Sequence, residues 1–177
     1  MAYGKYIEDY RNQLVKIDDI LFELEKNHKT INSLSLDEQN TLDFHNYICD
    51  LENLTIYDCQ ELYPFEPPVS TYKEYERILF EMRSLIDRYL ICAYKEGEIN
   101  IVLSNRYQYK GQSTPTLELL KLLPANFYLY GSDPELNYMH AIRSNSLYEM
   151  KIYLYLSAKD GYEPAIIMVK EIFNWEI

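Results

Sequence analysis

Glycine is scarce in this chain, and with it the loops that bind phosphate groups. Only 5 of the 177 residues are glycine, and none belongs to a P-loop or to a G-x-G-x-x-G fingerprint. Such loops hold phosphates on backbone amides, so their absence argues against a nucleotide-dependent enzyme. The G-x-S-x-G and H-E-x-x-H signatures are absent as well. We therefore predict a protein that has no enzymatic activity and needs no cofactor.

Long apolar runs and paired cysteines are also missing. No run approaches the roughly 18 apolar residues of a membrane helix, and the N-terminus lacks the basic and apolar regions of a signal peptide. The three cysteines, Cys49, Cys59 and Cys92, contain no C-x-x-C pair. An odd, unpaired set is typical of reduced and mostly buried thiols. These features predict a cytoplasmic protein.

Lysine and arginine are absent between Thr30 and Tyr72, where eight acidic residues occur. The whole chain has a net charge of −11, and residues 1–66 contribute −9 of it. This balance argues against binding to nucleic acid or to anionic lipid, because both require clustered basic residues. A concentrated negative charge instead favours a basic protein partner. Solubility alone is the alternative explanation.

Tyrosine is unusually frequent, at 19 of 177 residues. Tyrosine is favoured at interfaces, but the favoured explanation here is that many tyrosines replace phenylalanine at the edges of a core. The overlap of tyrosines with the acidic stretch predicts a partner-binding face. Its members are Asp37, Glu38, Asp43, Tyr47, Asp50, Glu52, Tyr57, Asp58, Glu61, Tyr63 and Glu66.

The N-terminal segment shows the clearest helical pattern. Its apolar residues alternate at spacings of four and three, which defines a heptad-like seam. The seam consists of Tyr10, Leu14, Ile17, Leu21, Leu24, His28 and Ile31. We predict a helix that packs into an antiparallel bundle or forms a homodimer through this seam.

A second helix is predicted to begin at a capping box formed by Ser35 and Glu38. Phe44, Ile48 and Leu51 share one face of it, and the helix either continues to Leu62 or breaks near 53–55. Three prolines at 64, 67 and 68 end it in either case. We place a boundary there, between an acidic helical hairpin (1–66) and a helical body (67–177) that shares its core.

A third and central helix is predicted to begin at a second capping box, Thr71 with Glu74, and to end before Gly97. Its apolar face extends over about six turns. The opposite face mixes acids with Arg77, Arg83 and Arg88, which is the usual pattern of a solvated surface.

The segment between 98 and 131 is ambiguous. Alternating apolar residues predict a strand near 98–109, which could pair with a second one at 127–131. Between them, Thr114 and Pro115 are expected to begin a short helix that ends before Pro124.

The C-terminal third predicts three short helices near 134–144, 147–159 and 164–175, arranged as α-hairpins. The run at 153–166 resembles a junction between helical repeats, in which an aromatic-rich helix ends in Ser-Ala-x-x-Gly and a helix containing alanine follows. No second copy occurs at a fixed period, so this resemblance predicts packing and assigns no family. Trp175, the only tryptophan, is expected to dock the last helix onto the body.

One set of side chains has the types that bind transition metals. His45 and Cys49 lie four residues apart on one helical face, and Cys59 is a possible third ligand. Structural zinc sites usually show tighter spacing, so we predict two buried cysteines beside a half-exposed histidine and no metal site.

The sequence thus predicts a mainly α protein, a multi-helix bundle with C-terminal α-hairpins. The favoured function is that of a non-enzymatic binding protein whose acidic face engages a basic protein. Immunity proteins, antitoxins and phage anti-defence proteins are of this type, and some of them mimic DNA charge. One alternative is a helical-repeat-like scaffold that dimerises through its first helix. A metal-assisted enzyme at His45, Cys49 and Cys59 is the other.

Overall fold

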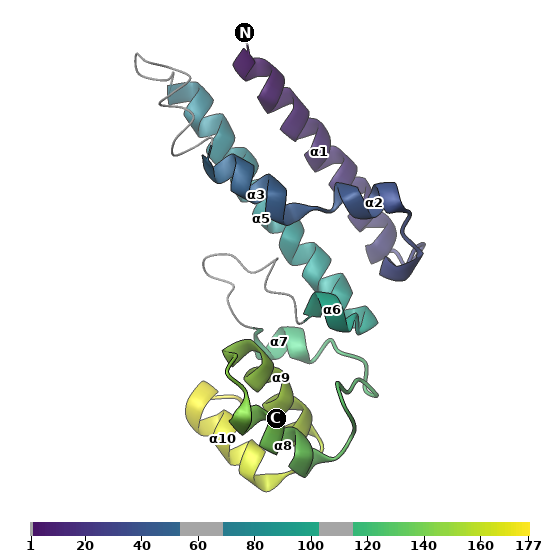
Figure 1. The fold of residues 1–177 in the computed structure, drawn as a ribbon, viewed down its shortest axis with the longest axis vertical. Helices are drawn as coiled ribbons and strands as arrows, with labels where there is room; N and C mark the ends of the chain where they lie inside the picture. The colour runs from purple at the N-terminus through teal and green to yellow at the C-terminus, as the bar shows by residue number, and fades with distance from the viewer. Residues whose placement is uncertain (1, 54–68, 103–114) are drawn as a thin grey trace. The chain divides into compact units, whose positions relative to one another are not determined.

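The protein is represented by a computed structural model that describes residues 2–53, 69–102 and 115–177. The chain forms two compact units, Met1–Cys92 and Ala93–Ile177. Every regular element in the described ranges is a helix (Figure 1), which confirms the predicted mainly α fold. The predicted boundary after residue 66 lies outside the described residues and stays a prediction.

Three helices build most of the described part of the first unit. These are α1 (Ala2–Glu25), α3 (Phe44–Asn53) and α5 (Val69–Glu96), while η1 (Ile31–Ser33) and α2 (Leu36–Thr41) connect the first two. Arg11 pairs with Glu74 and Glu25 pairs with Arg88, each across 63 residues. A constant offset between paired positions means that α1 and α5 run parallel.

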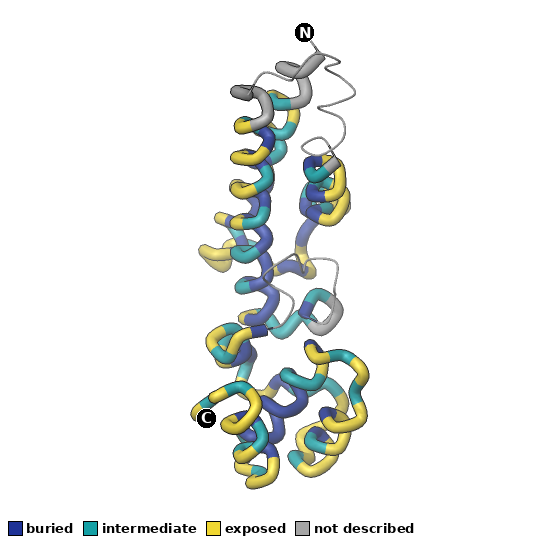
Figure 2. Tube along the Cα trace, turned by 90° about the vertical axis from the view of Figure 1, so that its left-hand side faces the viewer, coloured by how far each residue is buried: buried dark blue, intermediate teal, exposed yellow. Residues whose placement is uncertain are grey.

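Helix α3 runs antiparallel to this pair. Its N-terminal Phe44 contacts Tyr89, with ring centroids 5.6 Å apart, whereas Glu52 near its C-terminus bonds Arg83, which lies earlier in α5. Phe44, Ile48 and Leu51 are fully buried, which confirms the predicted apolar face of the second helix. Buried positions recur along one side of the long helices (Figure 2).

The seam predicted for the first helix is buried inside this unit, but the helix is shorter than expected. Leu14, Ile17, Leu21 and Leu24 belong to the core. The helix ends at Glu25 because Asn27 adopts a left-handed conformation (φ 60°) and the amide of His28 donates to the carbonyl of Glu23. His28 and Ile31 therefore lie outside the helix. A homodimer through the seam would have to compete with this internal packing.

The capping box of the second helix forms as predicted, but the helix is interrupted. The amide of Glu38 donates to Ser35 Oγ (3.2 Å), and the Glu38 carboxylate accepts from the amide of Ser35 (3.1 Å). The helix stops at Thr41, and α3 begins at Phe44. Between them Leu42 leaves helical geometry (ψ 22°) with its side chain buried, so tertiary packing breaks the helix here.

Helix α5 begins at Val69, so the predicted cap at Thr71 lies inside the helix instead of before it. Its end agrees with the prediction, because Gly97 has a positive φ of 68° and the amide of Glu98 bonds the carbonyl of Ala93.

No strand forms in the described residues of the ambiguous segment. Ile99–Val102 is a short helix, α6, and residues 127–131 are irregular, so the predicted strand pair is wrong there. Residues 103–109 lie outside the described part. The short helix predicted from Thr114 is α7 (Leu117–Leu120), capped by Thr116 Oγ1.

The second unit centres on three consecutive helices. They are α8 (Pro134–Arg143), α9 (Leu147–Lys159) and α10 (Glu163–Phe173), and α9 packs against both others. Every residue from Ile152 to Ala158 is buried, as expected for the middle helix of such an array. This confirms the predicted hairpins, although Asp133 and not Ser132 caps α8.

Trp175 docks onto this unit as expected. It packs against the core cluster that includes Leu154 and Val169, and its ring centroid lies 4.8 Å from that of Phe173.

None of the helices in the described ranges combines the length and the hydropathy that crossing a bilayer requires.

Candidate partner-binding surface

The described members of the predicted acidic face lie on α2, on α3 and in the turn between them. Asp37 and Asp50 are exposed, and neither forms an ion pair with any other described residue. Asp43 precedes α3 and accepts a hydrogen bond from Asn46 Nδ2 (2.6 Å). Five predicted members, Tyr57, Asp58, Glu61, Tyr63 and Glu66, lie outside the described residues.

Two other members of the predicted face are held in internal ion pairs. Lys29 Nζ lies 2.9 Å from Glu38 Oε2, and Arg83 Nη2 lies 2.9 Å from Glu52 Oε1. The hydrogen bond from Lys29 lowers the pKa of Glu38 below its usual value of 4.5. The carboxylates of Glu38 and Glu52 are therefore engaged within the unit, and each side chain is only partly exposed.

Tyr47 connects α3 to α1. Its hydroxyl donates to Gln13 Oε1 at 3.3 Å, and the side chain is half-buried. Burial raises the pKa of Tyr47, and the charge of Asp43 adds to this effect. The ring is therefore only partly accessible, because it belongs to the contact between α3 and α1.

All four arginines of the first unit are paired with carboxylates within it. Arg11 and Arg77 both pair with Glu74, while Arg88 bridges Asp18 and Glu25. Two of the arginines predicted on a solvated face instead connect helices. Arg83 joins α5 to α3, and Arg88 joins α5 to α1. The hydrogen bonds that Arg88 donates to Glu25 and Asp18 raise the pKa of Arg88 and keep it charged.

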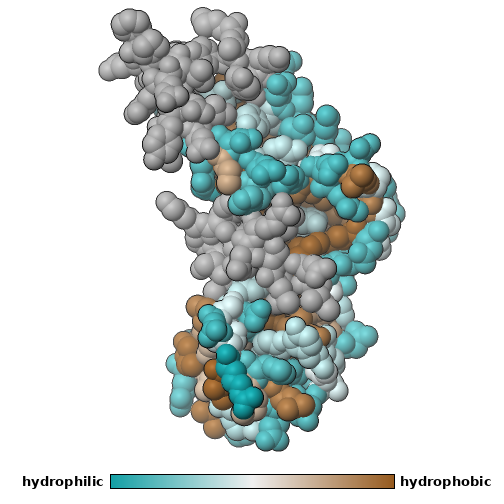
Figure 3. Space-filling model, viewed as in Figure 1, coloured by the Kyte–Doolittle hydropathy of each residue, from teal (hydrophilic) through white to brown (hydrophobic). Residues whose placement is uncertain are grey.

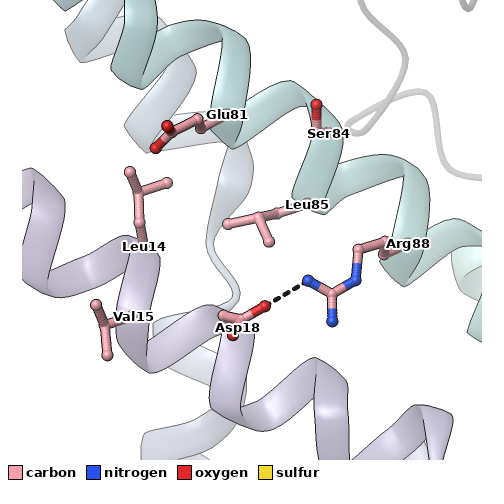
Figure 4. Close-up of a pocket in the computed structure, with 7 residues that line it drawn as sticks. All are labelled: Leu14, Val15, Asp18, Glu81, Ser84, Leu85 and Arg88. Carbon is pink, nitrogen blue, oxygen red and sulfur yellow. Dashed lines mark hydrogen bonds and ion pairs between the residues drawn. The ribbon is translucent and has the colours of Figure 1, made fainter. Parts of the chain in front are cut away.

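A groove of about 370 Å³ lies between α1 and α5 (Figure 4). Its α1 side is formed by Leu14, Val15 and Asp18, and its α5 side by Glu81, Ser84, Leu85 and Arg88. Leu14 and Leu85 are each 8% exposed and form an apolar floor, whereas Val15 is 61% exposed at the rim. This groove was not predicted from the sequence, where its only local signal is an apolar side chain, Val15, outside the seam.

The described residues hold no group of three potential metal ligands. His45 Nε2 lies 3.9 Å from Cys49 Sγ, and both side chains are exposed, which corrects the prediction that Cys49 is buried. Cys92 is buried as predicted, and Cys59 lies outside the described residues. The exposed His28 follows the end of α1, and its Nδ1 lies 3.1 Å from Glu23 Oε2.

Comparison with family models, with curated proteins and with solved structures found no match for this chain.

Proposed function

We propose that this chain is a non-enzymatic binding protein of the inhibitor type, whose first unit engages a basic protein through the exposed acids of α2 and α3. Immunity proteins, antitoxins and phage anti-defence proteins exemplify this class. A natural target is a positively charged surface that otherwise holds nucleic acid, which the acidic side chains would mimic.

One observation carries the proposal, namely the way charge is distributed in the first unit. Residues 1–92 contain 18 acidic and 9 basic residues. Five of those nine bases, Arg11, Lys29, Arg77, Arg83 and Arg88, are already paired with carboxylates of the same unit. Asp37 and Asp50 remain exposed on α2 and α3. The surplus negative charge is therefore available to an external cation.

A charged surface of this kind mainly affects the rate at which two proteins associate. Complementary charge raises the association rate and depends on ionic strength, because salt screens exposed charges over about 8–10 Å. Buried contact area has to come from elsewhere, since Tyr47 is half-buried in the unit's own packing. Binding through α2 and α3 should therefore weaken steeply as salt is added.

The test is a double charge reversal with a matched control. Asp37→Lys/Asp50→Lys changes one exposed acid in the first turn of α2 and one in the last turn of α3. Glu163→Lys/Glu171→Lys makes the same changes in the first and last turns of α10, also at exposed positions. Both variants change the net charge equally and disturb a helix end to a similar degree.

A basic partner captured from native lysate at low salt would be purified and titrated against both variants. We expect the α2–α3 variant to bind about tenfold more weakly or worse, and the α10 variant to stay within about threefold of the parent. An affinity that does not change with salt, or equal losses in the two variants, would refute the proposal.

A scaffold function is a second candidate, favoured by the C-terminal array. Its outer helices expose apolar side chains, among them Leu136 and Ile142 on α8 and Ile167 and Ile172 on α10. Separate apolar patches lie over these helices (Figure 3). If the array were the binding surface, the α10 variant would lose affinity and the α2–α3 variant would not.

A further inference from the structure

We infer, building on the proposed function, that the groove between α1 and α5 binds one amphipathic helix of the basic partner. The groove lies along two parallel helices, between the Arg11–Glu74 pair and the pair that joins Glu25 to Arg88. It has an apolar floor, and Val15 adds an exposed apolar side chain at its rim. An elongated apolar strip of this kind suits the apolar face of a helix.

The molecule already contains a helix packed in this manner. Helix α3 lies antiparallel against α1 and α5 and buries Phe44, Ile48 and Leu51, which follow spacings of four and three. None of these residues lines the groove, and the α2–α3 segment passes behind it in Figure 4. A helix in the groove would complete a four-helix arrangement around α1 and α5.

The charges around the groove select a basic occupant. Asp18 and Glu81 line it, and the one cation among its lining residues, Arg88, is already bridged by Asp18 and Glu25. A helix with Lys or Arg beside its apolar stripe would complement these carboxylates. A second copy of this chain fits poorly, because the first unit carries a net charge of −9 and like charges facing each other across an interface are unfavourable.

The probe is a synthetic amphipathic peptide of about 18 residues, long enough to form a helix, with Leu at every third or fourth position and Lys on both flanks. A peptide of the same composition in scrambled order is its control. Binding to the full-length chain is measured by fluorescence anisotropy and located by amide chemical shifts. The chain is also examined alone by analytical ultracentrifugation.

Two variants separate the groove from general electrostatic attraction. Val15→Lys places a charge at the apolar rim, and Phe22→Lys makes a similar change at an exposed apolar residue two turns further along α1, outside the groove. Ser84→Trp fills the groove from α5 and serves as a second test. Circular dichroism checks that each variant is folded.

We expect Val15→Lys and Ser84→Trp each to weaken peptide binding about tenfold or more, and Phe22→Lys to change it less than about threefold. The scrambled peptide should bind about tenfold more weakly than the amphipathic one. Equal effects of Val15→Lys and Phe22→Lys, or equal binding of the two peptides, would overturn the inference. A dimer of the chain that Val15→Lys dissociates would overturn it too, because the occupant would then be a second copy.

Failure of this inference can be told apart from failure of the proposed function. Val15 and Ser84 lie on α1 and α5, away from α2 and α3. If the groove variants have no effect on peptide binding, Asp37→Lys/Asp50→Lys should still weaken binding of the captured partner. Conversely, if that double reversal has no effect on the partner, the proposed function fails whatever the peptide does.

Discussion

The contacts inside the first unit differ in kind from the contacts inside the second. The first unit joins its helices by ion pairs between residues 31 to 70 positions apart, at partly exposed side chains. The second unit buries a hydrogen bond between Tyr94 and Tyr148 (3.0 Å) and packs Tyr138 against Tyr162 with ring centroids 5.3 Å apart. Their charges differ accordingly, since residues 93–177 carry only −2. Ion pairs between helices are thus characteristic of the first unit, which also packs Phe44 against Tyr89, and contacts between tyrosines are characteristic of the second.

One cationic side chain from each unit illustrates two kinds of contact. In the first, Arg88 bridges two carboxylates. In the second, Lys151 Nζ lies 5.0 Å from the centroid of Phe173 and 5.7 Å from that of Trp175, and burial lowers its pKa. Aromatic faces attract such a cation without neutralising it. The first unit thus pairs five of its nine bases with its own carboxylates and keeps an excess of negative charge.

The largest expected effect comes from cavities in the two cores. Leu21 and Leu154 are both fully buried, one in each unit. Replacing either with alanine should lower the free energy of unfolding by about 2–5 kcal/mol. Because the units are separately compact, Leu21→Ala should reduce amide protection mainly in residues 1–92 and Leu154→Ala mainly in 93–177. Hydrogen exchange with mass spectrometry would show this, and equal losses throughout the chain would contradict the division.

A smaller effect separates the two kinds of interaction by their response to salt. Tyr94→Phe removes a buried hydrogen bond and should cost about 0.5–1.5 kcal/mol at any ionic strength. Arg88→Met removes a bridge whose arginine side chain is 32% exposed, so its cost should stay below about 1 kcal/mol at low salt. Urea unfolding at low salt and at about 0.5 M salt would distinguish them, because screening should shrink the Arg88 effect alone. If the stability lost in Tyr94→Phe also shrank with added salt, the two kinds of interaction would not differ in the way described.

The smallest effect concerns Glu38 and depends on pH. Its pKa is lower in the folded protein than its usual value of 4.5, chiefly because Lys29 donates a hydrogen bond to it. A depressed carboxyl pKa contributes stability that is complete above the unfolded value and lost as the pH falls through the folded value. Glu38→Gln should therefore be less stable than the parent by about a few tenths of a kcal/mol at pH 7, and this gap should shrink as the pH falls below the usual carboxyl value.

Urea unfolding at pH 7 and pH 3 measures this difference. Glu76→Gln is the control, because Glu76 is exposed on α5 and pairs with no basic residue in the described ranges. A gap between Glu38→Gln and the parent that widens on acidification would contradict the assignment.

Local sequence signals predicted the fold well where the determining residues are close together in the chain. The Ser35–Glu38 box, Gly97 as a helix terminator and Pro134 at the start of α8 all act within a turn of their own position. Errors arose where a packing requirement overrode a local pattern. The buried Leu42 divided one predicted helix into α2 and α3. The end of α1 was a different error, because the exposed Asn27 takes up the left-handed conformation that asparagine often adopts after a helix, and this local signal outweighed the apolar seam.

The candidate site was predictable in composition but not in arrangement. The acidic stretch between Thr30 and Tyr72 is visible in the sequence, and the exposure of Asp37 and Asp50 agrees with it. The sequence could not indicate that Glu38 and Glu52 are committed to Lys29 and Arg83. It also gave no reason to separate Cys49, which is exposed, from the buried Cys92.

By itself, the sequence determined the helical class of this protein, most of its helix ends and the excess of negative charge in its first part. Each of these depends on residue type or on neighbours within about four positions along the chain. Only the tertiary structure decided which carboxylates are neutralised and where a groove opens. Those features depend on the parallel register of α1 and α5, which brings together residues 63 and 70 positions apart, beyond the reach of any local pattern.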